Sequence, residues 1–403
     1  MKKELKERIA KIADKLVECS LYAIAFFLPI SIAIIESFVC FALFGFIIKK
    51  IMLPDFKFIK SRTSLFLLLF FIFCGFSLLN SGLYIDKSFN ALFGKWGQYI
   101  LVFFIVQDTL VSKKRIRNTV GILLFVGLLV AFDGFSQRFL GWEFLRGKYV
   151  GVINGSLKAV TGPFQHYNGL AAYLVCILTL FISIIFVKSN LRFLALLKDK
   201  AIYWVKFLLL FLLAGCLFLT FSRGGWVGFL FASLLMLFLT RKWKLMLLPC
   251  LFMLVLVLVP GIRERVMGGD SGRFNVWGGA WAMIKDHPLL GVGIGTFMAN
   301  FSQYTKGLGV FYAHNCYLQI WAETGIFALL SFISFLFLLL RQGVKAFRKT
   351  HDYIVLGLAC GIFGFLVHSF FDVHLYSLQL AVLFWFMAGM LAVVSKDGII
   401  LQE

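Results

Sequence analysis

The sequence is poor in charge, and above all in acidic charge. Its 403 residues include 19 Asp and Glu against 40 Lys and Arg, and the four charged types together make up only 15% of the chain. Soluble domains carry roughly 25% charged residues and are about half apolar, so this charge content together with 61% hydrophobic residues excludes a soluble globular protein. The sequence also lacks a GxxxxGK[ST] loop, a GxGxxG opening a βαβ unit, an HExxH helix and a carboxylate cluster on a predicted outer loop. These absences argue against nucleotide-driven and metal-dependent chemistry, and we expect neither a cofactor nor a metal.

Cysteine is present, but without the spacing of a disulfide framework or a zinc site. The eight cysteines include no CxxC pair and lie in or beside apolar runs. We therefore predict that they are small buried hydrophobic residues.

The chain is rich in long apolar runs, since 61% of its residues are hydrophobic. A membrane-crossing helix needs about 20 mostly apolar residues. Runs of this kind lie at 64–80, 92–110, 118–138, 166–187, 203–221, 225–240, 245–260, 315–340, 353–371 and 375–395. A further run at 20–48 is interrupted by Pro29, Ser31 and Glu36, so it predicts either one long helix or a hairpin of two short ones.

The distribution of charge favours the hairpin. With a hairpin there are about twelve crossings, and 28 of the 40 Lys and Arg residues lie in segments on one side of the membrane. That asymmetry is typical of cytoplasmic loops, so both termini are predicted to be cytoplasmic. The net charge of +21 is then explained by cytoplasmic loops that lie against an anionic lipid bilayer, so we expect the bilayer as a partner and no nucleic acid. The fold class predicted is an all-α polytopic membrane protein, with residues 1–19 expected to form an uncleaved amphipathic lead-in.

The predicted crossings divide the chain into three regions. Residues 1–260 form an N-terminal membrane bundle of nine crossings, residues 261–313 a large periplasmic loop, and residues 314–403 a C-terminal bundle of three crossings. The loop has a helical pattern over 274–288, which Pro288 ends, followed by a glycine-rich turn at 289–297. We expect a partly helical cap on the outer surface.

Two arginines are candidates for binding an anion. Arg223 follows a tight turn and precedes two glycines, and Arg273 begins the helical pattern of the large loop. Arginine binds phosphate bidentately, and a helix N-terminus offers free N–H groups to anions. The alternatives are a snorkelling anchor for Arg223 and a solvated loop residue for Arg273. Lys95, at the start of a predicted crossing, is a weaker candidate for the same anion.

His314 is the candidate general base. It lies where the large loop ends and the next crossing begins, followed by Asn315 and, two to three turns later, by Glu323. A histidine at a wet helix start can be neutral near pH 7 and accept a proton from a hydroxyl. The alternative is a hydrogen-bonded histidine at the interface.

Two further polar groups are predicted at outer helix ends. The first contains Gln165, His166 and Asn168, which could bind sugar or merely cap a helix. The second contains His368 and Asp372, which are four residues apart and therefore on one helical face. A structural polar clasp explains the second group at least as well as catalysis does.

These motifs resemble the O-antigen ligase family. The resemblance is concentrated in TFSRGGWVG (220–228), SGRFNVWGGAWAMIKDHPLLGVGIGTF (271–297) and AHNCYLQIWAETGIFALL (313–330). It implies a GT-C-like membrane fold and an undecaprenyl-pyrophosphate glycan donor without a divalent metal. By the same resemblance Arg223 and Arg273 hold the donor pyrophosphate, and His314 is the base acting on the acceptor hydroxyl. The basic and aromatic segment 139–166 matches no family role.

The function implied is an inverting glycosyl transfer to lipid A-core on the periplasmic face, in lipopolysaccharide biosynthesis. An O-antigen polymerase of the same superfamily would use the same donor with another lipid-linked repeat as acceptor. A protein-glycosylating relative should carry a larger extra outer domain. A transporter or flippase of lipid-linked oligosaccharide predicts charges through the membrane centre and inverted repeats, and the sequence has neither.

Overall fold

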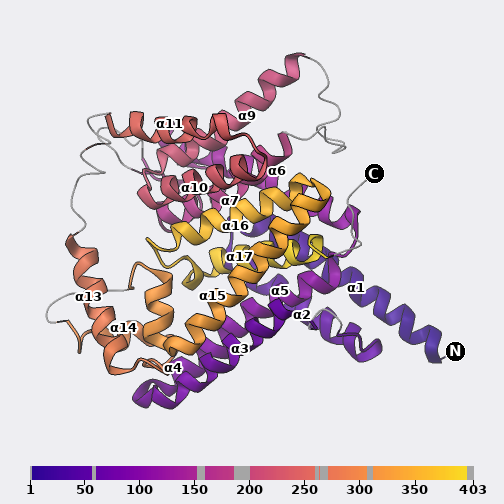
Figure 1. Cartoon of the computed structure of the whole chain (residues 1–403). Helices are drawn as coiled ribbons and strands as arrows, with labels where there is room; N and C mark the ends of the chain where they lie inside the picture. The colour runs from indigo at the N-terminus through magenta and orange to yellow at the C-terminus, as the bar shows by residue number, and fades with distance from the viewer. Residues whose placement is uncertain are drawn as a thin grey trace.

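A computed structural model describes residues 2–56, 60–151, 159–185, 200–258, 263, 271–305 and 312–396. The described chain is helical apart from one short hairpin (Figure 1). Its α-helices are α1 (Lys2–Phe27), α2 (Ile32–Met52), α3 (Arg62–Phe76), α4 (Ile85–Phe89), α5 (Gln98–Thr109), α6 (Lys113–Phe139), α7 (Tyr167–Ile185), α9 (Lys200–Leu219), α10 (Arg223–Leu239), α11 (Leu247–Leu258), α13 (Ser271–Asp286), α14 (Phe297–Phe301), α15 (Cys316–Thr350), α16 (Tyr353–His368) and α17 (Leu378–Val394). The hairpin pairs β1 (Trp142–Glu143) with β2 (Lys148–Tyr149). The other elements are the 3₁₀-helices η2 (Ser77–Asn80), η3 (Gly82–Tyr84), η5 (Trp243–Leu245) and η6 (His374–Tyr376), and the π-helix η4 (Asn90–Gly97).

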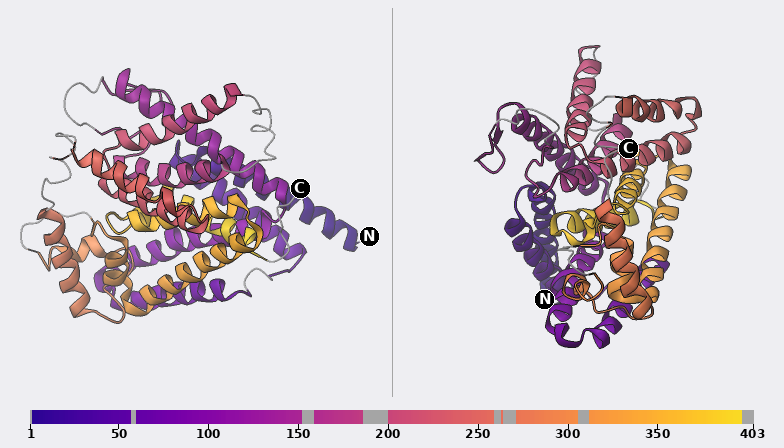
Figure 2. Two further views of the ribbon diagram at one scale, coloured as in Figure 1. Left: turned by 45° about the horizontal axis from the view of Figure 1, so that its top comes forward. Right: turned by 90° about the vertical axis from the view of Figure 1, so that its left-hand side faces the viewer.

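The helices identify an all-α membrane protein. Six described helical segments are long and apolar enough to cross a bilayer, and four shorter apolar helices accompany them. Each predicted apolar run contains an α-helix, whereas the total of twelve crossings stays a prediction. In the described part of the chain, α1 lies at one end of the molecule and α13 at the opposite end (Figures 1 and 2). We call these the α1 end and the α13 end.

The N-terminal run forms two helices, as the hairpin interpretation predicted. α1 and α2 pack against each other and are joined by residues 28–31, which include Pro29. The lead-in and the first apolar run are not separate elements, however, because α1 is continuous from Lys2. A stripe of buried residues at helical spacing runs through α1 from Ala10 onward, across the boundary between the lead-in and the apolar run, and explains this continuity. These residues are Ala10, Ala13, Val17, Leu21 and Ile24.

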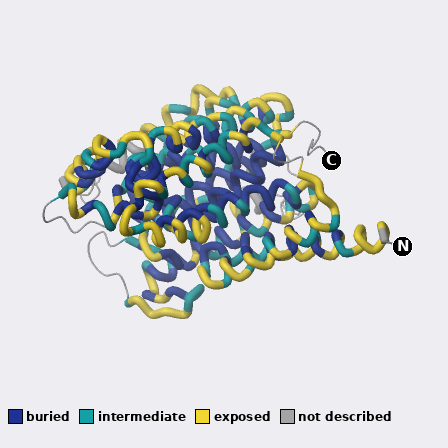
Figure 3. Tube along the Cα trace, turned by 90° about the horizontal axis from the view of Figure 1, so that it is seen from below, coloured by how far each residue is buried: buried dark blue, intermediate teal, exposed yellow. Residues whose placement is uncertain are grey.

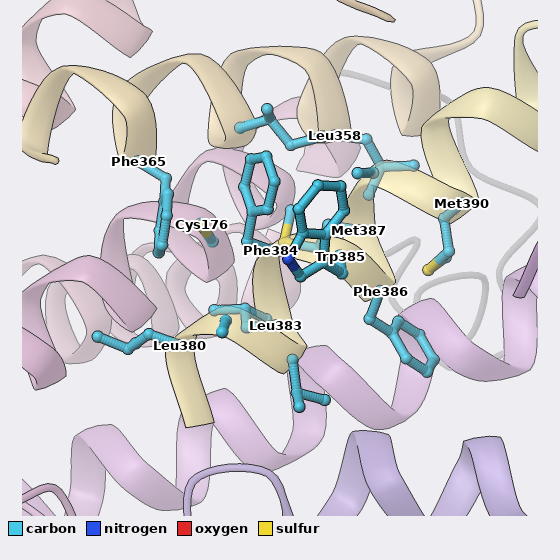
Figure 4. Close-up of a cluster of buried hydrophobic side chains, with 14 of the residues drawn as sticks. Cys176, Leu358, Phe365, Leu380, Leu383, Phe384, Trp385, Phe386, Met387 and Met390 are labelled. Atoms are coloured by element: carbon cyan, nitrogen blue, oxygen red, sulfur yellow. The ribbon is translucent and has the colours of Figure 1, made fainter. Parts of the chain in front are cut away.

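The C-terminal helix α17 is the centre of the core. Every residue from Gln379 to Val394 is buried, as expected for a helix that is hydrophobic on all sides. Figure 4 shows Phe384, Trp385 and Met387 among side chains of neighbouring helices, and Figure 3 shows the buried chain along the centre of the molecule. Surrounding helices, α5 and α16 among them, pack on α17 and cover it.

The cysteine prediction is correct in part. Five cysteines are buried in the helical core, namely Cys74, Cys176, Cys216, Cys316 and Cys360. The other three are exposed on the protein surface, namely Cys19, Cys40 and Cys250. They lie on helix faces that the rest of the chain leaves uncovered, which an apolar run does not reveal.

The predicted glycine turn at 289–297 docks into a break in α15. The break is at Gly325, whose φ of 77° and ψ of 177° are not helical. A break leaves backbone groups of the helix without their usual partners. The turn pairs these groups through hydrogen bonds from Val292 N to Ala322 O (2.9 Å), from Gly293 N to Glu323 O (2.9 Å) and from Ile326 N to Pro288 O (3.0 Å). The cap helices α13 and α14, which flank the turn, are thereby fixed to α15.

The close approach of the two backbones requires glycine on both sides. A Cβ atom at Gly325 would lie 1.9 Å from the carbonyl oxygen of Leu289, and a Cβ atom at Gly291 would lie 2.3 Å from the carbonyl carbon of Glu323. Both glycines also have positive φ, which other residues adopt at a cost. Gly291 of the turn and Gly325 of α15 are therefore both required for the same backbone contact between the turn and α15.

Candidate functional site

The predicted site residues gather at the α13 end of the bundle. They come from helix ends: Lys95 precedes α5, Asn168 lies in the first turn of α7, Arg223 begins α10, Arg273 lies in the first turn of α13, His314 precedes α15, and His368 ends α16. Residues far apart in sequence line three neighbouring cavities there. We call them the arginine, histidine and lysine cavities.

The arginine cavity has a volume of about 220 Å³ and contains both predicted arginines. Its lining includes residues from the first turns of α7, α10 and α13, together with the end of α16. These residues are Tyr167, Asn168, Phe221, Arg223, Gly224, Arg273, His368 and Phe371. Free N–H groups at helix N-termini and the two guanidinium groups all favour a negatively charged ligand.

The sequence around Arg223 explains how α10 begins at this cavity. The Ser222 hydroxyl caps the helix by accepting a hydrogen bond from Gly225 N (3.1 Å). Phe221, just before it, has a φ of 48°, which turns the chain sharply between α9 and α10. A Cβ atom at Gly224 would lie 2.5 Å from Cδ2 of His368, so glycine is what allows the His368 ring to reach the helix start.

The histidine cavity is larger, about 390 Å³, and contains His314. Gln165, His166, Asp372 and Tyr376 also line it. Nδ1 of His314 lies 3.4 Å from Oδ1 of Asp372, and the His314 side chain is 42% exposed. His314 is therefore held by a carboxylate on one side while remaining accessible from the cavity.

Backbone geometry presents His314 to this cavity. Its φ of 49° is one of four positive values among the non-glycine residues of the described chain. Asn315, which follows, caps α15 by accepting hydrogen bonds from Tyr317 N (2.9 Å) and Leu318 N (3.1 Å). Strained backbone of this kind is often found at functional sites. Asn315 thus fixes the start of α15 directly after His314.

A chain of hydrogen bonds connects the arginine and histidine cavities. Asn168 Nδ2 donates to Asp372 Oδ2 (2.6 Å), and Ser222 Oγ donates to Asn168 Oδ1 (2.7 Å). Ser222 Oγ also lies 3.3 Å from Nε2 of His368. His368 and Asp372, expected to pair with each other, make these separate contacts instead. The reason is that α16 ends at His368, so Asp372 lies in the following loop and not one helical turn further along the same face.

The electrostatic environment keeps Asp372 ionised. Burial alone would raise the pKa of its carboxyl, but the contacts with His314, His374, Val373 and Asn168 outweigh burial and hold the pKa below its ordinary value. Burial lowers the pKa of His374 to about 4, so this ring is neutral at pH 7. An ionised carboxylate can accept the Nδ1 proton of His314, which leaves Nε2 as the proton acceptor.

The lysine cavity adjoins the histidine cavity. Its volume is about 260 Å³, and it shares Tyr312 and Tyr376 with the histidine cavity. Lys95 lines it together with Lys87, which sequence reasoning did not single out. Lys95 therefore lines a different cavity from Arg223 and Arg273, and these two cavities share no lining residue.

Glu323 supports this end of the site. Its carboxylate is buried and accepts hydrogen bonds from Gly295 N (2.9 Å), Phe297 N (3.2 Å), Gln319 Nε2 (3.3 Å) and the hydroxyl of Tyr376 (3.0 Å). These contacts fix the glycine turn and the aromatic side chain shared by the two cavities. Glu323 is too fully occupied by these donors to serve readily as a base.

Several site residues were not identified from the sequence. Ser222 could have been noticed, because serine before a helix start is typical of an N-cap. Tyr376 carries no such signal, since it reaches the site only through the packing of the η6 segment.

The fold and the site together define a multi-pass, all-α membrane protein with a polar, cationic site at one end of its helices. The family model described as O-antigen ligase matches residues 208–333, a segment that includes Arg223, Arg273 and His314. This similarity confirms the resemblance to the O-antigen ligase family and indicates a glycan-transferring function of the O-antigen ligase and polymerase superfamily. No curated protein matches the chain.

Proposed function

We propose that the protein is an O-antigen ligase of the bacterial inner membrane. It transfers a glycan from undecaprenyl-pyrophosphate to a sugar hydroxyl of lipid A-core at the periplasmic face. The observation that carries this proposal is the connection of the two cavities, because it brings a cationic cavity and an accessible histidine within one hydrogen-bonded network.

The donor pyrophosphate binds in the arginine cavity. Arg223 and Arg273 come from two different elements, α10 and α13, so a pyrophosphate between them also links the cap to the membrane bundle. The N-terminal turns of three helices add favourable dipoles. This arrangement stabilises the negative charge that grows on the leaving group as the glycosidic bond breaks.

His314 is the general base, and Asp372 positions it. Nε2 of His314 accepts the proton of the acceptor hydroxyl, while the hydroxyl oxygen forms a bond to the anomeric carbon of the donor. The bond between that carbon and the pyrophosphate oxygen breaks, and its electron pair leaves with the pyrophosphate. The attack comes from the side opposite the leaving group, so the anomeric configuration is inverted. No covalent intermediate and no metal take part in this scheme.

The proposed regions have distinct tasks in this reaction. The loop 261–313 supplies Arg273 through α13, and Trp277 of the same helix donates a hydrogen bond to the carbonyl of Ala313 (3.0 Å), directly before His314. Residues 1–260 contribute Arg223 and Asn168, and residues 314–403 contribute His314 and Asp372. A GT-C-like bundle of twelve crossings holds these three parts at the periplasmic surface.

Reconstitution tests the proposal directly. The purified protein in liposomes is given undecaprenyl-pyrophosphate glycan with either lipid A-core or a second lipid-linked repeat, each with and without EDTA. Consumption of lipid A-core, unaffected by EDTA, is the expected result. Consumption of the lipid-linked repeat instead identifies a polymerase. Movement of the donor across the bilayer without a new glycosidic bond contradicts both and identifies a transporter.

A further inference from the structure

The three cavities are arranged in a definite order, which their shared walls establish. The arginine cavity meets the histidine cavity at the hydrogen bond between Asn168 and Asp372 (2.6 Å). The histidine cavity meets the lysine cavity at Tyr312 and Tyr376, which line both. His314 thus lies between a cavity with two arginines and a cavity with two lysines.

The lysine cavity has the features of a saccharide subsite. Trp96 and Tyr376 pack edge to face with ring centroids 5.5 Å apart, and Tyr312 lies 6.4 Å from Tyr376. Aromatic walls suit the apolar faces of sugar rings. Asn90, on the π-helix η4, adds an amide that can donate and accept hydrogen bonds. Helices of this type frequently occur at functional sites.

The lysine cavity also has positive charge on its lining. Lys87 and Lys95 are both exposed and come from α4 and η4, so the two residues lie about two turns apart on one continuous helical segment. Nζ of Lys87 lies 5.1 Å from the ring of Tyr84. Glu323, which lines the same cavity, is already bonded to four donors. A ligand that enters here meets positive charge and aromatic rings together.

We infer that the lysine cavity is the acceptor subsite and that it selects a saccharide carrying phosphate groups, which Lys87 and Lys95 bind. A sugar held there extends past Tyr312 and Tyr376 toward His314, while the donor approaches from the opposite side. This inference rests on the proposed function, since it presupposes a reaction between two glycans. It separates Lys95 from the donor pyrophosphate, for which its place at the start of a predicted crossing had made it a weaker candidate.

Binding to the full-length protein in detergent tests the inference without transfer. The probe is a lipid-free core oligosaccharide that carries phosphate, compared with the same oligosaccharide after phosphatase treatment. The wild-type protein is expected to bind the phosphorylated form about tenfold more tightly, and the double variant Lys87→Gln/Lys95→Gln to lose this preference. Lys95→Arg should retain it. Lys285→Gln, on the exposed surface of α13, is the matched control and should bind as the wild type does.

Donor affinity separates the two lysines from the arginines. The double variant should bind undecaprenyl-pyrophosphate as the wild type does. A double variant that keeps the preference for phosphate, or that loses donor binding instead, overturns the inference, as does a wild type without any preference. If the wild type shows the preference but transfers no glycan, the subsite stands and the proposed function fails. If it transfers glycan without the preference, the proposed function stands and the subsite fails.

Discussion

Basic residues gather at both ends of the helical bundle, but in different arrangements. At the α1 end they form an ion-pair network with carboxylates. Lys49 lies 2.6 Å from Asp14 and 2.8 Å from Asp108, Lys50 lies 2.5 Å from Asp108, and Arg115 lies 2.6 Å from Asp14. At the α13 end Arg223, Arg273, Lys87 and Lys95 line cavities. The same residue types therefore fasten helices together at one end and offer a binding surface at the other.

This difference indicates that the basic residues have two separate roles in the molecule. The ion pairs at the α1 end join α1, α2, α5 and α6, so the charges there stabilise the packing of the bundle. At the α13 end the positive charge is arranged around space that a ligand can occupy. Substitutions at the two ends should consequently affect different properties, namely stability at the α1 end and transfer at the α13 end.

The largest effect is expected from His314→Asn. Asparagine tolerates the left-handed backbone conformation of residue 314, so the substitution removes the base without adding backbone strain. The transfer rate in the reconstituted system should fall by about 10³-fold, with donor affinity unchanged. His287→Asn, outside the three cavities, is the control and should keep wild-type activity. A His314→Asn protein with normal turnover rules out the base assignment.

The next effect is expected from Asp372→Asn. An amide cannot stabilise the protonated His314 ring as a carboxylate does, so kcat should fall by about 10²-fold while the KM values for both substrates change little. Asp372→Glu should recover part of the lost kcat. Steady-state kinetics on both variants provide the measurement. A rise in donor KM with unchanged kcat would instead place Asp372 in donor binding.

A smaller effect is expected from removing either arginine. Arg223→Ala and Arg273→Ala should each weaken the use of donor by at least about 1.5 kcal/mol, equivalent to roughly tenfold, because a charge-assisted hydrogen bond to phosphate is lost. The measurement is kcat/KM for the undecaprenyl-pyrophosphate donor at saturating acceptor. Unchanged dependence on donor concentration in both variants contradicts the assignment of the pyrophosphate to this cavity.

The smallest effect on activity is expected at the α1 end. Asp108→Asn leaves Lys49 and Lys50 without one of their carboxylate partners and should lower stability by about 1–3 kcal/mol. Thermal unfolding in detergent measures this loss, with Glu4→Gln on the exposed part of α1 as control. Transfer per folded molecule should stay at the wild-type value. A large loss of turnover in the folded Asp108→Asn protein would contradict the claim that charges at the α1 end affect stability and not transfer.

Much of the fold was predictable because its signals are local. An apolar run followed by a cluster of charge marks a helix and its end, which is why each predicted run contains an α-helix. Pro29 and the charge asymmetry were enough to predict two helices at the N-terminus. Pro288 and the glycines after it marked the end of the helix in the large loop and the turn that follows.

The contacts of the site were not predictable in the same way. Asp372 faces Asn168, which is 204 residues away, and its expected neighbour His368 faces Ser222 instead. The assignment of Lys95 to a cavity apart from the arginines also depends on how α4, η4 and α15 pack. Nothing in the spacing of these residues encodes such distances.

The sequence by itself determined an all-α membrane protein, the approximate positions of the long apolar helices, and the three motifs that carry Arg223, Arg273 and His314. These features depend on hydrophobicity and on residues close together in the chain. The thickness of the bilayer and the helical repeat impose a regular pattern on such residues, and this pattern can be recognised in the sequence. Only the tertiary structure decided which helix ends meet, that Asp372 is the partner of His314, and that three cavities follow one another. Those features depend on side chains brought together by the packing of helices distant in sequence.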